Sequence, residues 1–313
     1  TTCMLFCIKI YNLWIKTPCT CKTRMDGKTV IVTGSNTGIG KETARDLARR
    51  GARVILACRN LEKAKEARDD IIKTTGNKNV EIRELDLSSL LSVRTFAKDI
   101  IESEPRLDVL INNAGLGERN RILTADNFEM TFQVNHLGPF LLTCLLLDLM
   151  KKSAPSRIIM VSSYLHHLAR VDFNNLQSEK WHFWLQQYAI TKLGNILMAK
   201  ELTKKLKATV STAMCCLHRV ICTDIWEKLK QLSSLVYVLI MFSVKIFCKD
   251  AVEGSQTSIH LAVSEELKDV SGKHFWECKE TTPSKAARNE ALAQKFWERS
   301  EALVDLRPEE KFY

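Results

Sequence analysis

The sequence predicts one α/β domain built on a doubly wound parallel sheet, with helices on both faces. Short β-branched runs alternate along the chain with segments whose apolar residues recur at helical spacing. A glycine-rich turn joins the first such pair, and the composition of the 313 residues, 45% hydrophobic and 26% charged, is that of a globular protein. Because no linker or internal repeat divides the chain, we expect a single domain over residues 26–313, preceded by a separate segment, residues 1–25.

Each element follows from its local pattern. The first strand is predicted at Thr29–Val32, where a β-branched run ends before a glycine, and the first helix at Ile39–Arg50, where Gly51 stops the apolar periodicity. The same patterns predict strands Arg53–Ala57, Val80–Leu85, Leu107–Ile111 and Arg157–Ser162 and helices Leu61–Thr74, Ser88–Glu104, Asp126–Lys152 and Trp184–Leu206. After a sixth strand near Ala208–Cys216 the order weakens. The remaining segments are an irregular apolar stretch, Ile225–Cys248, a helix at Ala251–Val263 and a last strand at Lys273–Trp276.

Charge and cysteine content exclude several classes of protein. The formal net charge is +10, but basic residues are interleaved with acidic ones, so we expect no nucleic-acid partner; the excess suits an anionic ligand or a lipid surface. The chain holds 11 cysteines, an odd number without a C-x-x-C pair, which argues against a disulfide framework and against a tetrahedral zinc site. Cys19 and Cys21 are too close in sequence for a usual metal pair. We therefore predict no metal and a reducing compartment.

A glycine-rich turn lies between the first strand and the first helix. It runs through Gly34, Ser35, Asn36, Thr37, Gly38, Ile39 and Gly40. Glycines let the backbone turn tightly and approach a phosphate, and the helix N-terminus that follows offers unpaired N–H groups and a partial positive charge. In this context the turn predicts a Rossmann-type domain that binds the pyrophosphate of a dinucleotide through these residues.

The end of the second strand predicts which dinucleotide binds. An acidic residue there would hydrogen-bond the adenosine ribose of NAD, but Cys58 and Arg59 occupy the position. A guanidinium can pair in bidentate fashion with a 2′-phosphate. We therefore predict NADP(H) as the cofactor, selected by Arg59; the alternative is that Arg59 is only a surface charge.

Further motifs resemble those of the short-chain dehydrogenase/reductase family from Lys28 to Lys279. Besides the glycine turn, the matching residues are Asp86 after the third strand, Asn112-Asn113-Ala114-Gly115 after the fourth, Asn135 in Val134-Asn135-His136, Ser163 after the fifth, and Tyr188-Ala189-Ile190-Thr191-Lys192. The resemblance implies an oxidoreductase whose Asp86 contacts adenine. It also implies that Asn113, Ala114 and Gly115 belong to the cofactor site.

Tyr188 and Lys192 are predicted to carry the chemistry together. They are four residues apart on a predicted helix, so both side chains project from one face. A nearby ammonium favours the phenolate and so lowers the pKa of a tyrosine, about 10 when unperturbed. We expect Tyr188 to exchange a proton with the alcohol or carbonyl oxygen and Ser163 to hydrogen-bond that oxygen. The resemblance implies that Lys192 also holds the nicotinamide ribose and that Asn135, a helix-kinking residue in the family, supports a water-linked proton path. The alternative is an ordinary amphipathic helix with a buried tyrosine.

Three segments are similar to the retinol dehydrogenase branch of that family. They are Thr37–Ala44, Ala57–Asn60 and Leu176–Lys180. The resemblance implies a membrane-associated enzyme that interconverts retinol and retinal with NADP(H), on the cytoplasmic side of an intracellular membrane such as the endoplasmic reticulum, the cytosol being the alternative. Relatives with the same cofactor motifs handle other lipid or steroid carbonyls, so these substrates stay open, and the sequence does not give the oligomeric state.

Other segments depart from the family pattern or bear on the membrane. His218-Arg219 replaces the family's Pro-Gly after the sixth strand, which predicts reduced activity or altered substrate choice, or a catalytically weakened nucleotide-binding protein. The apolar run Leu232–Cys248 is interpreted as a lid, a membrane-contact helix or a core helix. Residues Met4–Ile15 are too short to span a bilayer and are either a truncated anchor, an interfacial segment or an uninformative leader. For three histidines near the expected pocket mouth we predict exposed or packing roles rather than catalysis. These histidines are His166, His167 and His182.

Overall fold

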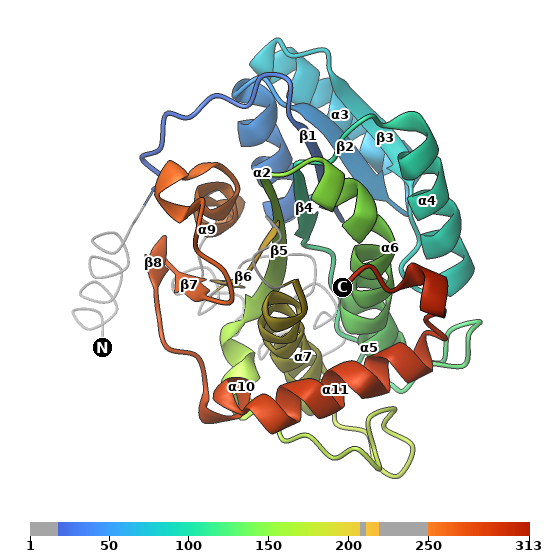
Figure 1. Cartoon of the computed structure of the whole chain (residues 1–313). Helices are drawn as coiled ribbons and strands as arrows, with labels where there is room; N and C mark the ends of the chain where they lie inside the picture. Colours follow the sequence, from blue (N-terminus) through green and yellow to red (C-terminus); the bar gives the residue numbers. More distant parts are fainter. Residues whose placement is uncertain (1–17, 207–210, 219–249) are drawn as a thin grey trace, which may run out of the picture.

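A single eight-stranded sheet forms the centre of the protein. The computed structural model describes residues 18–206, 211–218 and 250–313. The strands are β1 Thr29–Thr33, β2 Arg53–Cys58, β3 Val80–Glu84, β4 Val109–Asn112, β5 Ser156–Ser163, β6 Ser211–His218, β7 His274–Trp276 and β8 Lys279–Glu280. Their order is β3-β2-β1-β4-β5-β6-β7-β8, and all neighbours pair in parallel except β7 and β8 (Figure 1). The predicted fold class is confirmed, with an antiparallel edge strand added.

Helices cover both faces of this sheet. The α-helices are α2 Gly38–Arg49, α3 Leu61–Thr75, α4 Leu90–Ser103, α5 Met130–Phe132, α6 Gly138–Lys152, α7 Trp184–Leu206, α9 Ala251–Val263, α10 Lys285–Arg288 and α11 Glu290–Leu303. Short 3-10 turns follow at Tyr164–Leu168, Glu265–Leu267 and Pro308–Glu310. Helices α2, α3 and α9 share one apolar core with the sheet, and α4, α6, α7 and α11 share the other. Figure 1 shows α11 lying across α7, outside the sheet layer.

The two cores use alternate residues of the same strands. In β1, Val30 and Val32 pack with the α2 side, whereas Ile31 between them packs with the α6 side. In β5, Ile159 and Ile158 divide in the same way. Successive side chains of a strand point to opposite faces, so a strand buried on both faces must be apolar at every position. This requirement explains why the predicted strands read as continuous β-branched runs.

The helix predicted over Asp126–Lys152 differs from the structure in two ways. It begins at Met130, where the buried carboxylate of Glu129 accepts hydrogen bonds from the first N–H groups. It is also not a continuous α-helix, because Gln133–Leu137 forms a π-helical turn between α5 and α6. Insertions of this kind are rare and frequently lie at functional sites. Asn135 is at the centre of this turn, so the irregularity lies where the family resemblance placed a kink.

The same stretch, Met130–Lys152, is long and apolar enough to cross a membrane by length and composition. However, 89% of its most apolar window is buried inside the domain, so it is the central core helix of one sheet face.

The predicted runs Met4–Ile15 and Leu232–Cys248 lie outside the described residues, as does Arg219. Residues 18–25, which the sequence assigned to the leader, lie on the domain: Met25 is buried in the α2-side core. The backbone N–H of Cys19 donates to the side chain of Gln256 on α9 (3.0 Å).

Candidate active site

The glycine turn after β1 is shaped by positions where no side chain fits. Gly34 has φ +62°, and a Cβ there would lie 2.9 Å from the Cα and Cβ of Ala114. At Gly40, in the first turn of α2, a Cβ would lie 2.5 Å from the side-chain nitrogen of Asn113 and from the carbonyl oxygen of Gly34. These distances are well below van der Waals contact, so both residues must be glycine for this turn to form. The turn therefore packs directly against the end of β4.

Two polar side chains hold the ends of β1 and β4 together. Asn113 donates through Nδ2 to the carbonyl oxygens of Thr33 (2.8 Å) and Gly34 (3.2 Å). Thr33 returns the contact, because its hydroxyl accepts from the N–H groups of Asn113 and Ala114, both at 3.0 Å. Thr33 was missed as a site residue in the sequence; its place at the start of the turn, on a buried strand, is the signal that could have found it. The side chain of Ser35, by contrast, points inward and donates to Val32 O (2.8 Å).

The N-terminus of α2 has no side-chain cap. Its N-cap residue, Thr37, makes no capping hydrogen bond. Helices α3, α4, α9 and α11 all begin with a side chain that accepts from a first-turn N–H group. Uncapped N–H groups at a helix start, together with the helix dipole, suit an anion. The glycine turn leads directly into these open N–H groups, an arrangement that fits the phosphates of a dinucleotide.

The residues expected to select the nucleotide lie beside the turn. Arg59 follows β2 directly, is exposed, and makes no ion pair or hydrogen bond with any residue the structure describes. The Cys58 thiol lies 3.6 Å from the Ser35 hydroxyl, and burial raises its pKa. The carboxylate of Asp86 accepts hydrogen bonds from the backbone N–H (2.9 Å) and hydroxyl (2.6 Å) of Ser88. The guanidinium of Arg59 is thus exposed at the end of β2 and has no partner among the described residues. Asp86 organises the turn after β3. The contact of Asp86 with adenine stays a prediction.

Ser163 and Tyr188 meet at the end of β5. Ser163 is the last residue of that strand. Tyr188 lies in the second turn of α7, and this helix packs against β5. Burial raises the pKa of Tyr188 to about 12, and a hydrogen bond from the Ser163 hydroxyl opposes this shift. The phenol is therefore protonated at neutral pH and is paired with Ser163, the residue that the sequence predicted to hydrogen-bond the same substrate oxygen. A Cβ at Gly117, in the loop after β4, would contact the Tyr188 ring at 3.7 Å and Trp184 at 3.8 Å.

Lys192 joins this pair from one helical turn further along α7. Its ammonium lies 5.5 Å from the centre of the Tyr188 ring, and Nζ donates to the carbonyl oxygen of Val161 at 3.2 Å. The side chain is almost fully buried. A positive charge beside a phenol favours the phenolate, but burial is the largest cause and the net shift in the pKa of Tyr188 is upward, so the lowering that the sequence predicted is not observed. The predicted i, i+4 pairing itself is realised in space.

Asn135 reaches the same point from the π-helical turn. Its side-chain amide forms two hydrogen bonds of 2.8 Å with the backbone of Leu116, donating to the carbonyl and accepting from the N–H. Its Nδ2 also donates to the Thr191 hydroxyl (3.2 Å). A Cβ at Gly115 would lie 3.1 Å from Lys192 Nζ and 3.4 Å from Asn135 Oδ1. The loop after β4, the π-helical turn and α7 thus converge on Gly115.

Comparison with known proteins decides the family. Residues 28–233 match the family model described as short chain dehydrogenase. The chain belongs to this family. Human retinol dehydrogenase 11 is 47% identical over 289 residues, which cover 92% of this chain and 89% of that protein, and human retinol dehydrogenase 13 is 45% identical over 92% and 88%. As a short-chain dehydrogenase, the protein is an oxidoreductase of a family that uses a nicotinamide cofactor.

Solved structures share the fold of this dehydrogenase. The crystal structure of an uncharacterized protein from Mycobacterium paratuberculosis is 30% identical, covers 90% of this chain and 95% of its own, and superimposes with a TM-score of 0.71. A gluconate 5-dehydrogenase from Burkholderia cenocepacia, in complex with NADP and tartrate, is 23% identical with a TM-score of 0.62, covering 80% and 94%. The second likeness is one of fold alone.

A second layer of side chains supports the dehydrogenase site, and the sequence did not reveal it. His166 is fully buried: Nδ1 donates to the carbonyl oxygen of Ser163 (2.8 Å), and Nε2 accepts from the N–H of Ser284 (3.2 Å). Burial lowers its pKa to about 4, so the imidazole is neutral and both nitrogens are used. His167 is exposed, and His182 contacts Arg119 O at 3.1 Å. The predicted packing or exposed roles thus agree with the structure, although His166 is placed directly behind Ser163.

Asn195 and His136 form a corresponding support on the other side of α7. Asn195 donates to Val161 O (3.1 Å), the same carbonyl that Lys192 contacts. His136, next to Asn135, lies 3.3 Å from Asn195 Oδ1 and 2.9 Å from the hydroxyl of Ser300 on α11. Helix α11 packs closely here, since a Cβ at Gly194 would lie 2.7 Å from Phe296. The C-terminal helix α11 therefore helps to position α7.

Proposed function

We propose that this short-chain dehydrogenase is an NADP(H)-dependent enzyme that interconverts an alcohol and a carbonyl on a hydrophobic substrate, retinol and retinal being the first candidates. The observation that carries the proposal is the convergence of Ser163, Tyr188 and Lys192 beside Gly115, next to the glycine turn and the uncapped N-terminus of α2. When bound, the nicotinamide would supply or accept the hydride. The remaining chemistry is proton transfer, which these side chains can perform.

In carbonyl reduction, Tyr188 donates the proton that the new alcohol oxygen needs. Its raised pKa keeps the phenol protonated at neutral pH, and Ser163 hydrogen-bonds the same oxygen and orients it. In the oxidative direction the phenolate must accept the proton, and the Lys192 ammonium, 5.5 Å from the ring centre, together with Ser163 stabilises that form. Asn135 is a positioning residue, because its hydrogen bonds fix Leu116 and the loop that carries Gly115. We assign the ribose of the nicotinamide to Lys192.

The preference for NADP(H) is supported by Arg59. The residue is exposed, forms no ion pair with the described residues, and follows β2, where an NAD-specific enzyme would carry an acid. A planar guanidinium is well suited to a 2′-phosphate. Gly34, Ser35, Asn36, Thr37, Gly38, Ile39 and Gly40 would hold the pyrophosphate through the backbone and the open N-terminus of α2.

A hydrophobic substrate is supported by the surroundings of Tyr188. Trp184 and the ring of Tyr188 lie against Gly117, and several large apolar side chains remain exposed on the adjoining segments. These exposed side chains are Tyr164, Leu168, Trp181 and Phe183. The relatives named retinol dehydrogenase make a retinoid the first substrate to test. Exposed apolar side chains also suit contact with a membrane surface. The location we propose is the cytoplasmic side of an intracellular membrane, such as the endoplasmic reticulum, with the cytosol as the alternative.

The test is NADPH oxidation by the purified full chain with all-trans-retinal and a panel of simple aldehydes. We expect turnover to be fastest with retinal and the Tyr188→Phe variant to lose about 10²–10⁴-fold in kcat, because the general acid is removed. NADPH binding, followed by its fluorescence, should be unchanged in this variant. The matched control is Tyr313→Phe, which removes a phenol near the C-terminus.

Two outcomes would contradict the proposal. Faster turnover of small polar aldehydes would exclude the hydrophobic substrate while leaving the chemistry in place. NADPH binding without turnover of any carbonyl would instead favour the weakened nucleotide-binding protein that His218-Arg219 suggested; His218 ends β6 in the structure.

A further inference from the structure

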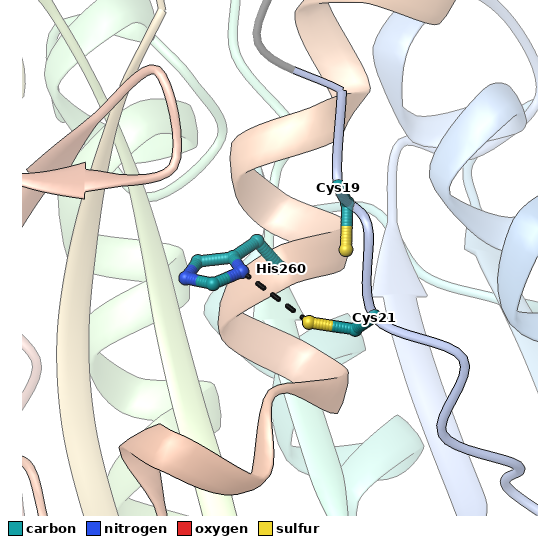
Figure 2. Close-up of side chains that lie close together, drawn as sticks. All are labelled: Cys19, Cys21 and His260. Atoms are coloured by element: carbon teal, nitrogen blue, oxygen red, sulfur yellow. Dashed lines mark hydrogen bonds between the residues drawn. The ribbon is translucent and has the colours of Figure 1, made fainter.

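A cluster of metal-ligating side chains lies outside the candidate active site. Cys19 and Cys21 come from the segment that precedes β1, and His260 comes from the last turn of α9, more than two hundred residues later (Figure 2). The Cys21 sulfur lies 3.6 Å from Nδ1 of His260. The two sulfurs and this nitrogen all lie within 4.8 Å of one another. The sequence predicted no metal, because Cys19 and Cys21 are too close in sequence for a usual metal pair; the fold brings His260 beside them.

The spacing of the three atoms suits a tetrahedral ion. Zinc binds cysteine sulfur at about 2.3 Å and histidine nitrogen at about 2.0–2.1 Å, which places neighbouring ligand atoms of a tetrahedron roughly 3.5–3.8 Å apart. The observed separation between Cys21 and His260 falls in this range. In Figure 2 the Cys21 sulfur and the imidazole point toward one another, and the Cys19 sulfur projects toward the same space. Only the Cys19 side chain needs a small adjustment to complete the set.

Two arginines lie beside the cluster, and thiolate is the form of cysteine that binds a metal. Arg50 donates to the carbonyl oxygens of Cys21 (2.7 Å) and Thr23 (3.0 Å), which holds this segment in place. Arg157, fixed by the carbonyl oxygens at the end of α9, interacts with Cys21 as well.

We propose that Cys19, Cys21 and His260 bind one zinc ion, which fastens the segment before β1 to helix α9. Binding converts two thiols to thiolates, so two protons leave as one Zn²⁺ enters, and the imidazole binds in its neutral form without releasing a proton. The fourth position of the tetrahedron is left to water. Two thiolates and an imidazole form a soft to borderline donor set that favours zinc over magnesium or calcium.

The expected consequence is structural. Residues 18–25 are tied to the domain by the Cys19–Gln256 hydrogen bond, the Arg50 contacts and the burial of Met25. A bound zinc ion would add a cross-link that closes a loop through almost the whole domain. A ligand that binds only the folded state stabilises it according to its concentration and affinity. We therefore expect zinc to raise the thermal stability of the chain and to order its N-terminal segment.

The test uses the full chain, purified under reducing conditions, stripped with a chelator and titrated with ZnCl₂ against a chromophoric competitor. We expect one Zn²⁺ per chain with release of two protons, a higher Tm, and protection of Cys19 and Cys21 from iodoacetamide as mapped by mass spectrometry. His260→Gln and Cys21→Ser should each weaken zinc binding by at least about 100-fold, since each removes a ligand. The matched control, Cys144→Ala, removes a thiol from the core of α6 and should bind zinc as the wild type does.

A second measurement on the unaltered protein keeps the result independent of variant folding. Co²⁺ in place of zinc should give the near-ultraviolet charge-transfer band of thiolate ligands, and added ZnCl₂ should abolish it. The proposal is overturned if wild-type protein binds no zinc, if Cys21→Ser binds it unchanged, or if alkylation of Cys19 and Cys21 proceeds equally with and without ZnCl₂. A Cys19–Cys21 disulfide that persists in the reduced preparation would overturn it as well.

Discussion

Two regions lie on the same edge of the sheet but are built by opposite means. One is the glycine turn after β1, and the other is the catalytic cluster at the end of β5, which consists of Ser163, Tyr188, Lys192 and Asn135. In the turn, the recognition groups are backbone N–H groups, and the critical positions are those that lack a side chain, Gly34 and Gly40. In the cluster, the working groups are side chains brought from a strand, a helix and a π-helical turn, and each is held by hydrogen bonds to buried partners.

This difference indicates where each region is vulnerable. The turn tolerates no added volume, because a Cβ at Gly40 would lie 2.5 Å from Asn113 Nδ2 and from Gly34 O. The cluster tolerates no loss of a polar group, because a buried partner would be left without its hydrogen bond. Four predictions use this contrast, and they run from the largest expected effect to the smallest.

Removal of the ammonium from the cluster should have the greatest effect. Lys192→Met keeps the length and burial of the side chain but leaves Tyr188 without its positive neighbour, so kcat is expected to fall by about 10²–10⁴-fold. The control is Lys204→Met on the same helix, where the ammonium is half-exposed and pairs with Glu290 at 3.0 Å. Steady-state kinetics with NADPH and retinal measures both. Equal losses in the two variants would contradict a specific role for Lys192.

Added volume in the turn should mainly affect cofactor affinity. Gly40→Ala places a methyl group 2.5 Å from Asn113 Nδ2 and Gly34 O, so the turn must deform, and we expect NADPH to bind about 100-fold more weakly, equivalent to about 2.7 kcal/mol. Gly76→Ala is the control for an added methyl group, because nothing lies within 4 Å of it; unlike Gly40, Gly76 has a positive φ of +74°. Fluorescence titration with NADPH distinguishes them. An unchanged Kd in Gly40→Ala would show that the turn can relax.

Acid should lower the free energy of unfolding, because two buried histidines, His136 and His166, support the catalytic cluster in their neutral form. Burial lowers the pKa of His136 and His166 to about 4, whereas an unfolded histidine titrates near 6.5. Below pH 6.5 the unfolded chain therefore takes up protons that the folded chain does not, so their contribution to stability is complete above pH 6.5 and is lost as the pH falls toward 4. Each unit of pKa difference corresponds to about 1.4 kcal/mol. Urea unfolding between pH 4.5 and 7.5 measures the slope.

The acid dependence can be assigned with two variants. His166→Gln should reduce the slope of unfolding free energy against pH, because the titrating imidazole behind Ser163 is gone. His167→Gln, one residue further and exposed, should change it much less, because burial is the largest cause of the shift at His166 and the charge of His167 is the smallest. The assignment fails if both variants keep the wild-type slope.

The smallest expected effect concerns the choice of cofactor. Arg59→Ala removes a single exposed guanidinium, whose hydrogen bonds to a phosphate are weakened by solvent, so the preference for NADPH over NADH should fall about tenfold. Lys65→Ala, an exposed cation on α3, is the control for net charge. The ratio of kcat/KM for the two cofactors is the measurement. An unchanged ratio would make Arg59 a surface charge, the alternative that the sequence left open.

Local pattern was sufficient for much of this protein. Alternating strand and helix periods predicted the parallel sheet, because a strand buried on both faces must be apolar throughout. The glycines at 34 and 40 and the four-residue spacing of Tyr188 and Lys192 likewise appear in the sequence, since each is a constraint between residues close along the chain. The sequence could not place the π-helical turn at Gln133–Leu137, because α and π segments share the same apolar pattern and differ only in which carbonyl is paired.

Tertiary structure decided the contacts between distant segments. Only the packed chain shows that His166 ties Ser163 to Ser284, that Ser300 on α11 supports His136, and that His260 reaches Cys21. The sequence around each of these residues does not indicate its distant partner, because each residue taken alone is an ordinary residue of a helix or loop. Their roles arise when the two layers of helices close on the sheet and bury polar groups that must then find one another.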